Sequence, residues 1–278
     1  MVVQKALEKI AADAARGDLV FPTHAEMALR VQRMLDDPDC SFEQLSRLIA
    51  AEPMLSARVV AIANSVAYNR TGRGSVDVKT AISRLGLKTV RVLATAVVVR
   101  QMETMSKTPE HRALAAKLWE HTAHVAALAR VIAQRVVHVD PNAAFFAGIV
   151  HEVGGFYVLS RAASFPGLLE GELGEWDGEG EARVGGAVLR VLGVPQDILD
   201  AAETLWSGYL NFPPQSLGDA LLLAEQLAPV ESPLSKLAGT GHEGAPVDID
   251  VAIDDATLKS ILAESAEEVA SLVAALKS

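Results

Sequence analysis

The sequence predicts an all-α protein, and three observations lead to this prediction. Apolar residues recur at intervals of three and four along nearly every periodic segment, and no stretch shows the sustained alternation of a strand. Ser, Thr or Asp stands just before several of these segments, where helix N-caps are preferred. The 278 residues are 50% hydrophobic and 22% charged, so the chain can bury a substantial core.

The helices predicted in the first third of the chain follow from local signals. Segment 41–53, SFEQLSRLIAAEP, begins with a capping box in which Ser41 and Gln44 bond each other's backbone. Its predicted buried stripe consists of Phe42, Leu45, Leu48 and Ile49. The next helix, MLSARVVAIANS, is predicted to bury Leu55, Val59 and Ile62. In VDVKTAISRLG, Asp77 is the expected N-cap and Gly86 the expected residue just past the helix end.

Two longer helices are predicted where a cap residue precedes proline. Thr108-Pro109 and Asp140-Pro141 open the helices that hold His121 and His151. The glycine-rich stretch 171–186, GELGEWDGEGEARVGG, lacks the alternating carboxylates of a calcium loop and is predicted to be a solvated turn. Prolines and glycines after residue 229 indicate a connector, and a final apolar-striped helix is predicted from about Asp254.

Charge and composition exclude several classes of function. The net charge of −10 argues against nucleic acid as a partner, and Arg84, Lys88 and Arg91 are interpreted as a solvated helix face. The single Cys40 cannot form an internal disulfide, which fits a reducing compartment. No signal-peptide pattern opens the chain, and the aliphatic stretch 92–99 is too short to span a bilayer. The sequence therefore predicts a cytoplasmic protein with no membrane partner.

One apolar segment carries the chemistry of interest. Residues 145–159 read FFAGIVHEVGGFYVL, and they place His151 next to Glu152 in the middle of a helix that looks buried. Buried polar groups need partners, which could be a metal or one another. No G-x-S-x-G, P-loop or dinucleotide-binding motif is present.

Five segments in a fixed order resemble the HDOD family. They are FPTHAEMALRVQRMLDDPDCSFEQLSRLIAAEPMLSARVVAIANSVAY, VDVKTAISRLGLKTVRVLA, LWEHTAHVAALAR, FFAGIVHEVGG and VGGAVLRVLGVPQDILDAA. The resemblance runs from about residue 19 to 225. It implies an all-helical domain over 19–229, with an N-terminal lobe at 19–107 and a lobe at 108–229 similar to the metal-dependent HD phosphohydrolases. An N-terminal helix (1–18), a linker (230–253) and a C-terminal helix (254–278) would flank this domain.

The resemblance also implies where a metal would have been held. An HD hydrolase uses a first histidine, an adjacent His-Asp pair and a distant aspartate, which correspond here to His121, His151 with Glu152, and Asp219. Glutamate replaces the aspartate of the pair, no histidine occurs from Glu152 to Gly241, and Gly154-Gly155 replaces the usual Gly-Lys. These four residues are therefore predicted to be a remnant polar cluster that holds no metal or other cofactor and catalyses no reaction.

The function implied by the resemblance is that of a non-catalytic output module of bacterial signalling, which would bind signalling proteins. The alternatives are a residual metal-dependent phosphohydrolase and a nucleotide or cyclic-dinucleotide sensor. The predicted interaction surface consists of Arg58, Asn64, Tyr68, Arg73, Arg84, Lys88 and Arg91. Asn64 could instead cap its helix, and Tyr68 could pack in the core. The C-terminal helix is expected to dock on its own domain, with a homodimer contact as the alternative.

Overall fold

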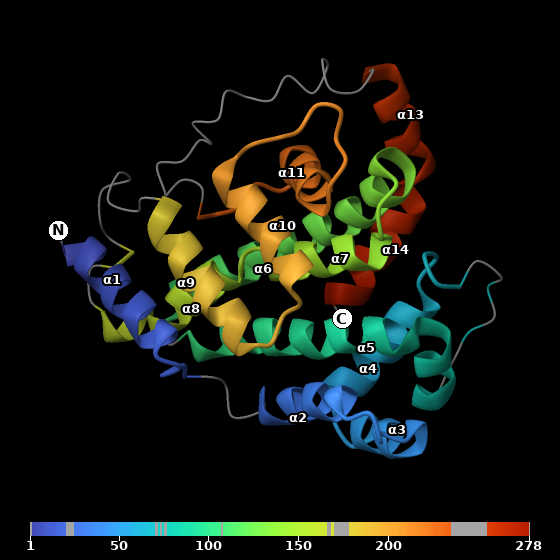
Figure 1. Cartoon of the computed structure of the whole chain (residues 1–278), viewed down its shortest axis with the longest axis horizontal. Helices are drawn as coiled ribbons and strands as arrows, with labels where there is room; N and C mark the ends of the chain where they lie inside the picture. Colours follow the sequence, from blue (N-terminus) through green and yellow to red (C-terminus); the bar gives the residue numbers. More distant parts are fainter. Residues whose placement is uncertain are drawn as a thin grey trace.

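The computed structural model describes residues 2–20, 25–69, 72, 74, 77–106, 108–165, 168–169, 178–234 and 255–277. Every regular element in these ranges is a helix, which confirms the all-α prediction (Figure 1). The N-terminal elements are α1 (Val2–Ala15), α2 (Ala25–Asp36), α3 (Phe42–Ala50), α4 (Pro53–Asn64) and α5 (Val78–Met102). The later elements are α6 (Pro109–Ile132), α7 (Pro141–Val150), α8 (Val153–Arg161), α9 (Gly178–Val191), α10 (Gln196–Ser207), α11 (Leu217–Leu227), α13 (Asp255–Glu264) and α14 (Ala266–Lys277).

Local capping signals place the helices α3 to α5 as expected. Ser41 Oγ accepts a hydrogen bond from the Gln44 amide at 3.1 Å, and Asp77 Oδ1 accepts one from the Thr80 amide at 2.8 Å. Gly86, with φ +78°, interrupts the helical geometry inside α5. The side chains of Leu55, Val59 and Ile62 are fully buried. Each of these features depends on residues within one turn of one another, so the sequence determines it directly.

The predicted buried stripe of α3 needs one correction. Leu45 and Ile49 are fully buried, but Phe42 is 38% exposed. Phe42 is the first residue of its helix, and helical side chains lean toward the N-terminus, so its ring extends past the start of α3 and away from the core face.

The helices α6 and α7 pack very closely against each other. A Cβ atom at Gly148 would lie only 2.4 Å from the Cα atom of Ala126, so glycine is required where these backbones meet. Thr108 and Asp140 cap α6 and α7, as predicted. Residues Pro141–Ser164 are long and apolar enough to cross a membrane by length and composition, but 89% of the most apolar window is buried inside the protein. This burial is that of a core helix.

The acidic stretch 171–186 was predicted to be a loop, and this prediction is wrong for its second half. Residues from Gly178 onward belong to α9, which packs against α1 and α8. The side chains of Val184 and Val188 are fully buried there. Burial of these valines in tertiary contacts therefore outweighs the low helix propensity of the glycines around them.

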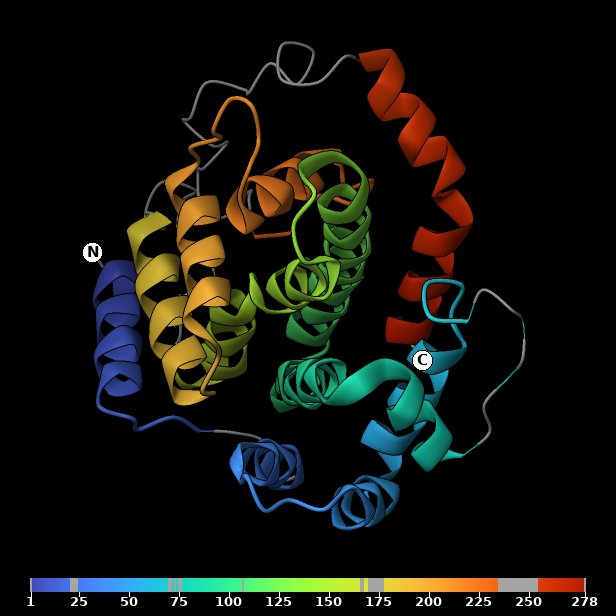
Figure 2. The same cartoon turned by 45° about the vertical axis from the view of Figure 1, so that its right-hand side comes forward.

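The C-terminal segment forms two helices where one was predicted. Ser265 separates α13 from α14, and its hydroxyl donates a 2.7 Å hydrogen bond to the carbonyl of Ile261 one turn earlier, a contact that bends helices. Figure 2 shows α14 running beside α6 and close to the end of α4, two helices that it contacts. Leu272 and Leu276 are fully buried, and Trp119 Nε1 donates to the Leu276 carbonyl at 3.2 Å. The apolar face of α14 thus docks on its own chain.

The predicted linker, 230–253, does not behave as a linker throughout. Residues 230–234 are described, and Leu234 is 1% exposed. The rest of the predicted linker, 235–253, lies outside the described residues. The sequence analysis did not predict the burial of Leu234, because residues 229–234 are rich in proline and polar residues, which is typical of loops. A loop can nevertheless place one apolar side chain against the core.

Candidate functional site

Two histidines, one from α6 and one from the end of α7, meet in the core. His121 lies in the middle of α6, and His151 is the residue that follows α7. Their side chains are 1% and 3% exposed, and their Nε2 atoms are 3.3 Å apart. The close packing of α6 and α7 at Gly148 brings the two rings to this distance.

Backbone carbonyls fix the orientation of both rings. The Nδ1 atom of His121 lies 2.7 Å from the carbonyl oxygen of Val230, and that of His151 lies 2.8 Å from the carbonyl oxygen of Gly148. A carbonyl oxygen can only accept, so Nδ1 is the protonated donor in each ring. Both Nε2 atoms therefore point inward, toward the same space.

Glu225 of α11 supplies the carboxylate nearest to both histidines. Its Oε2 atom lies 3.1 Å from Nε2 of His121 and 3.3 Å from Nε2 of His151. The sequence analysis did not include Glu225. The available signal was that the apolar helix LGDALLLAEQL holds two acidic residues, Asp219 and Glu225, of which the sequence analysis chose Asp219.

Glu152 also reaches the cluster. It occupies the junction between α7 and α8, with φ −93° and ψ 12°, and its side chain is 8% exposed. Its Oε1 atom lies 3.7 Å from Nε2 of His121. His121, His151 and Glu152 each offer one ligand atom, and these atoms all lie within 4.8 Å of one another. Three of the four residues predicted from the sequence are thus brought together.

Asp219, the fourth predicted residue, has a different role. Its carboxylate accepts hydrogen bonds from the amides of Asn211, Gln215 and Ser216 at 2.9–3.0 Å, and from the Ser216 hydroxyl at 2.7 Å. The Ser216 hydroxyl in turn accepts from the Asp219 amide and completes a capping box at the start of α11. Asp219 was predicted to join the cluster, but it holds the loop before α11, because backbone amides within a few residues already satisfy both oxygens.

The cluster sets the charges of its members. Burial alone would lower the pKa of His121, but the hydrogen bond and charge of Glu225, together with the charge of Glu152, raise it to about 9. Burial alone would raise the pKa of Glu225, but hydrogen bonds to His121 and His151 hold it well below its usual value. Without any metal, His121 is therefore a cation and Glu225 an anion at neutral pH.

A leucine from the segment after α11 lies beside Gly155 and next to Glu152 of the cluster. A Cβ atom at Gly155 would lie 2.3 Å from Cδ1 of Leu234 and 3.2 Å from Oε2 of Glu152. Leu234 thus fills the space into which any side chain at position 155 would grow. Segment 230–234 supplies this cover and also the carbonyl that accepts from His121.

The predicted interaction residues are not all exposed, and Arg58 needs a correction. It is 3% exposed, and its guanidinium carbon lies 5.6 Å from the centre of the Trp119 ring. Burial, with the charge of Arg100, lowers the pKa of Arg58 to about 10. It sits on the core side of α4, so it is not part of a surface. Arg73 lies outside the described residues.

Tyr68, which follows α4, contacts residues of α6 and α7. Its hydroxyl donates to Oδ1 of Asn142 in α7 at 2.7 Å, and Arg130 of α6 donates to the same oxygen at 2.8 Å. The Arg130 guanidinium also lies over the Tyr68 ring, 4.5 Å from its centre. Asn64 ends α4, and Arg84 donates to the neighbouring carbonyl of Ala63 at 2.7 Å. The contacts of Tyr68 tie the segment after α4 to α6 and α7, and the bond from Arg84 ties α5 to the end of α4.

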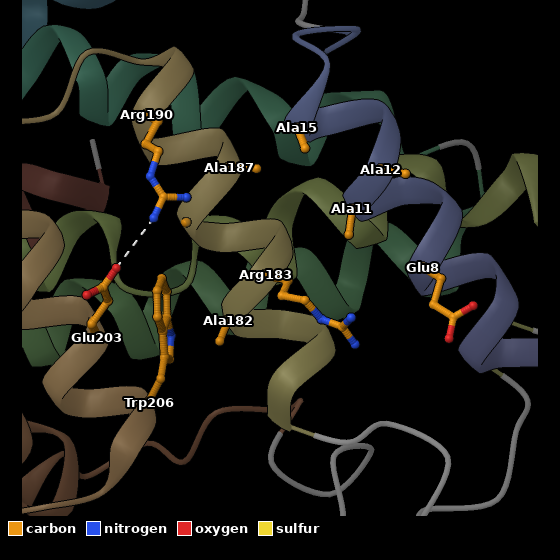
Figure 3. Close-up of a pocket in the computed structure, with 11 residues that line it drawn as sticks. Glu8, Ala11, Ala12, Ala15, Ala182, Arg183, Ala187, Arg190, Glu203 and Trp206 are labelled. Atoms are coloured by element: carbon orange, nitrogen blue, oxygen red, sulfur yellow. Dashed lines mark ion pairs between the residues drawn. The ribbon is translucent and has the colours of Figure 1, made fainter.

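Two pockets lie away from the histidines. The first, of about 540 Å³, lies between the lobes and is lined by Lys88 and Arg91 of α5, Phe146 of α7 and Asp197 of α10, among others. Within it Arg91 pairs with Asp36 at 2.6 Å. The second, of about 560 Å³, lies between α1, α9 and α10 (Figure 3). Alanines of α1 and α9 form its walls, beside Trp206 and the ion pair of Arg190 with Glu203 at 3.5 Å.

The described elements form an all-helical domain that holds a buried cluster of histidine and glutamate side chains. The chain belongs to the HDOD domain family, whose model matches residues 21–171. No curated protein matches the chain.

Three solved structures show the same fold. One is a Shewanella amazonensis protein named provisionally as a metal-dependent phosphohydrolase, with 22% identity, a TM-score of 0.73, and coverage of 99% of this chain and 100% of the other. Another is an HDOD domain protein of unknown function from Geobacter sulfurreducens, with 21% identity, a TM-score of 0.62, and coverage of 98% and 97%. The third, from Marinobacter aquaeolei, is named provisionally as a signal transduction protein, with 16% identity, a TM-score of 0.57, and coverage of 99% and 66%.

Proposed function

We propose that this protein is a non-catalytic output module of bacterial signal transduction that acts by binding other proteins. The observation that carries the proposal is the closure of the histidine–glutamate cluster. A catalytic metal site keeps one position open for water or substrate. Here His121, His151 and Glu152 are buried, and Leu234 fills the space beside Gly155 in which a side chain would lie next to Glu152.

The comparisons are compatible with this proposal. Membership of the HDOD family and a fold neighbour named for signal transduction both associate the fold with signalling. The surface proposed for partner binding is the rim of the pocket between the lobes. Arg91 pairs there with Asp36, and Asp140 and Asp197 also line the pocket. Lys88 is exposed at this rim, and we propose that it pairs with an acidic group of the partner.

Two experiments test the proposal. In the first, the purified protein is offered phosphomonoesters, phosphodiesters and cyclic dinucleotides with Mn²⁺, Mg²⁺, Fe²⁺ or Zn²⁺, and no turnover is expected. Turnover that disappears in His151→Ala would overturn it. In parallel, a rise in melting temperature with a nucleotide would favour a sensor instead.

The second experiment tests the surface. Proteins from the native host are captured with immobilised wild type, Lys88→Glu and Arg190→Glu. Arg190→Glu is the control, because Arg190 lines the other pocket, between α1, α9 and α10. We expect Lys88→Glu to reduce capture of a specific partner at least several-fold with an unchanged melting temperature, and Arg190→Glu to leave capture unchanged. Equal capture by all three proteins would exclude this surface.

One observation favours a second candidate, a residual metal-dependent phosphohydrolase. Both Nε2 atoms and the carboxylate oxygen of Glu225 converge within 3.3 Å of one another, as donors around an ion do. Converging donor atoms favour the binding of an ion, but hydrolysis also needs an open position at that ion. The arrangement therefore supports ion binding more directly than it supports hydrolysis.

A further inference from the structure

Arg58 of α4 is a buried cation, and two of its three guanidinium nitrogens have no acceptor among the described residues. The residue is 3% exposed, and its Nε and Nη1 atoms are buried without a hydrogen-bond partner. Burial lowers its pKa only to about 10, so the side chain still carries its charge at neutral pH. A buried charge that lacks both a counter-ion and hydrogen bonds is unfavourable, so a partner for this side chain is expected.

A second arginine, Arg100 at the end of α5, increases the excess of positive charge. The guanidinium carbons of Arg58 and Arg100 lie 5.6 and 5.3 Å from the centre of the same Trp119 ring. The face of the ring attracts cations, but the ring provides no lone pair in the plane of a guanidinium for its N–H groups. Trp119 therefore does not replace an anion.

Two carboxylates on the helices around Arg58 already have basic partners. Glu103, just after α5, forms an ion pair with Arg100. Glu120 of α6 pairs with Lys277 of α14 at 2.7 Å. Burial and the charge of Arg100 lower the pKa of Arg58, and no carboxylate opposes this effect. The charges of these four neighbours cancel in pairs, so Arg58 leaves one uncompensated positive charge.

We propose that Arg58 and Arg100 bind a small oxyanion, a phosphate or a carboxylate group, beside the Trp119 ring. A planar guanidinium can donate two parallel N–H groups to two oxygens of such an anion, and hydrogen bonds between charged groups are stronger than neutral ones. The Arg100 side chain is 29% exposed, so the anion reaches the site from solvent on that side. Trp119 and His121 are two positions apart on α6 and point to different sides of it, so this site is separate from the histidine cluster.

The bound anion would link α4 to α5 over α6. Arg58 and Arg100 come from the first two of these helices, and Trp119 comes from the third. The Nε1 atom of Trp119 donates to the Leu276 carbonyl of α14 at 3.2 Å, so a fourth helix adjoins the site. An anion that binds only the folded chain shifts the unfolding equilibrium toward the native state, so the melting temperature should rise with its concentration.

The test measures the binding of inorganic phosphate and of acetate to the full chain by isothermal titration calorimetry in Tris chloride buffer at constant ionic strength. We expect the wild type to bind one anion per chain. Arg58→Met keeps the length of the side chain but removes its charge, and it should weaken binding at least tenfold. Arg190→Met is the matched control, because Arg190 is 62% exposed and pairs with Glu203 at 3.5 Å. This control should bind the anion as the wild type does.

A second measurement distinguishes an anion site from a purely structural arginine. The free energies of unfolding of the wild type and of Arg58→Met are compared with and without phosphate. Phosphate also stabilises folded proteins because it is excluded from their surface, but both proteins share that effect. We expect the difference between the two to shift in favour of the wild type when phosphate is added. An unchanged difference would show that Arg58 only packs against Trp119, and it would overturn the inference.

The binding data can also refute the site. A wild type that binds neither phosphate nor acetate excludes it, and equal binding by Arg58→Met would place the anion elsewhere. If Arg58→Met does not fold, Arg100→Met replaces it, because Arg100 is partly exposed. Arg100→Met should weaken binding several-fold, and unchanged binding would contradict the proposal. Binding of either anion that depends on these arginines supports the site, and the tighter of the two identifies the group that it takes.

Discussion

The Nε2 atom of His121 lies 3.1 Å from Oε2 of Glu225, although 104 positions separate the two residues in the chain. This contact joins α6 to α11 in the core. It also raises the pKa of His121 and lowers that of Glu225, so the pair is ionised at neutral pH. A buried charged pair tolerates the loss of one partner poorly, because the other charge is left without compensation.

Replacement of His151 by alanine should destabilise the fold by about 1–3 kcal/mol in chelator-containing buffer. The change leaves the carbonyl of Gly148 without its donor and removes one of the two imidazoles beside the carboxylate of Glu225. Denaturant unfolding measures the effect, with Glu120→Ala on the exposed face of α6 as a control that should cost under about 1 kcal/mol. Equal stability of wild type and His151→Ala would show that the cluster contributes little to the fold.

Gly155→Ala should cost about 1–3 kcal/mol, because the new methyl group would overlap Cδ1 of Leu234. Gly186→Ala is the matched control, since its Cβ would meet only the end of the Arg190 side chain at 3.4 Å. Shortening the leucine in the double variant with Leu234→Ala should relieve the overlap, so the two changes should be less than additive. Strict additivity in denaturant unfolding would contradict the placement of Leu234.

Asp219→Asn should destabilise the protein by about 1–3 kcal/mol at pH 7, because a charged acceptor of several hydrogen bonds is lost. Burial would raise the pKa of Asp219, but the amides of Gln215 and Asn211 outweigh it and lower the pKa. A lowered folded-state pKa stabilises the protein above the unfolded value and loses that effect as pH falls. The difference in unfolding free energy between the wild type and Asp219→Asn should therefore decrease below about pH 4. A difference that stays constant with pH would argue against this role.

Tyr68→Phe should cost about 0.5–1.5 kcal/mol, since its hydroxyl donates to Asn142 at the junction of the lobes. Burial raises the pKa of Tyr68, so the hydroxyl keeps its proton and donates. Tyr209→Phe is the natural comparison, because Tyr209 is 80% exposed and should lose almost nothing. If the two variants unfold at the same denaturant concentration, the Tyr68 bond does not hold the lobes together.

Leu276→Ala should cost about 2–5 kcal/mol, because this fully buried side chain anchors α14 beside Trp119. Val191→Ala, at a residue that is 43% exposed, should have a small effect. The melting temperature of the wild type should not depend on protein concentration if α14 docks within its own chain. A strong concentration dependence would support the alternative of a homodimer through this helix.

The sequence by itself determined the features that depend on neighbours within one helical turn. The caps at Ser41, Asp77, Thr108 and Asp140 and the break at Gly86 are all of this kind. Periodicity also predicted the fully buried Leu55, Val59 and Ile62. A cap or an apolar stripe is formed by residues three or four positions apart, so its pattern is written locally in the sequence.

Only the tertiary structure decided which polar residues meet. The Ser216-x-x-Asp219 spacing is a local capping pattern, but the contact of Glu225 with His121 depends on how α11 is rotated against α6, which no local pattern records. The same holds for Arg58, which faces Trp119 in the core, and for Leu234, which fills the space beside Gly155. These contacts form between segments far apart in the chain, so their partners are fixed by helix packing and not by sequence spacing.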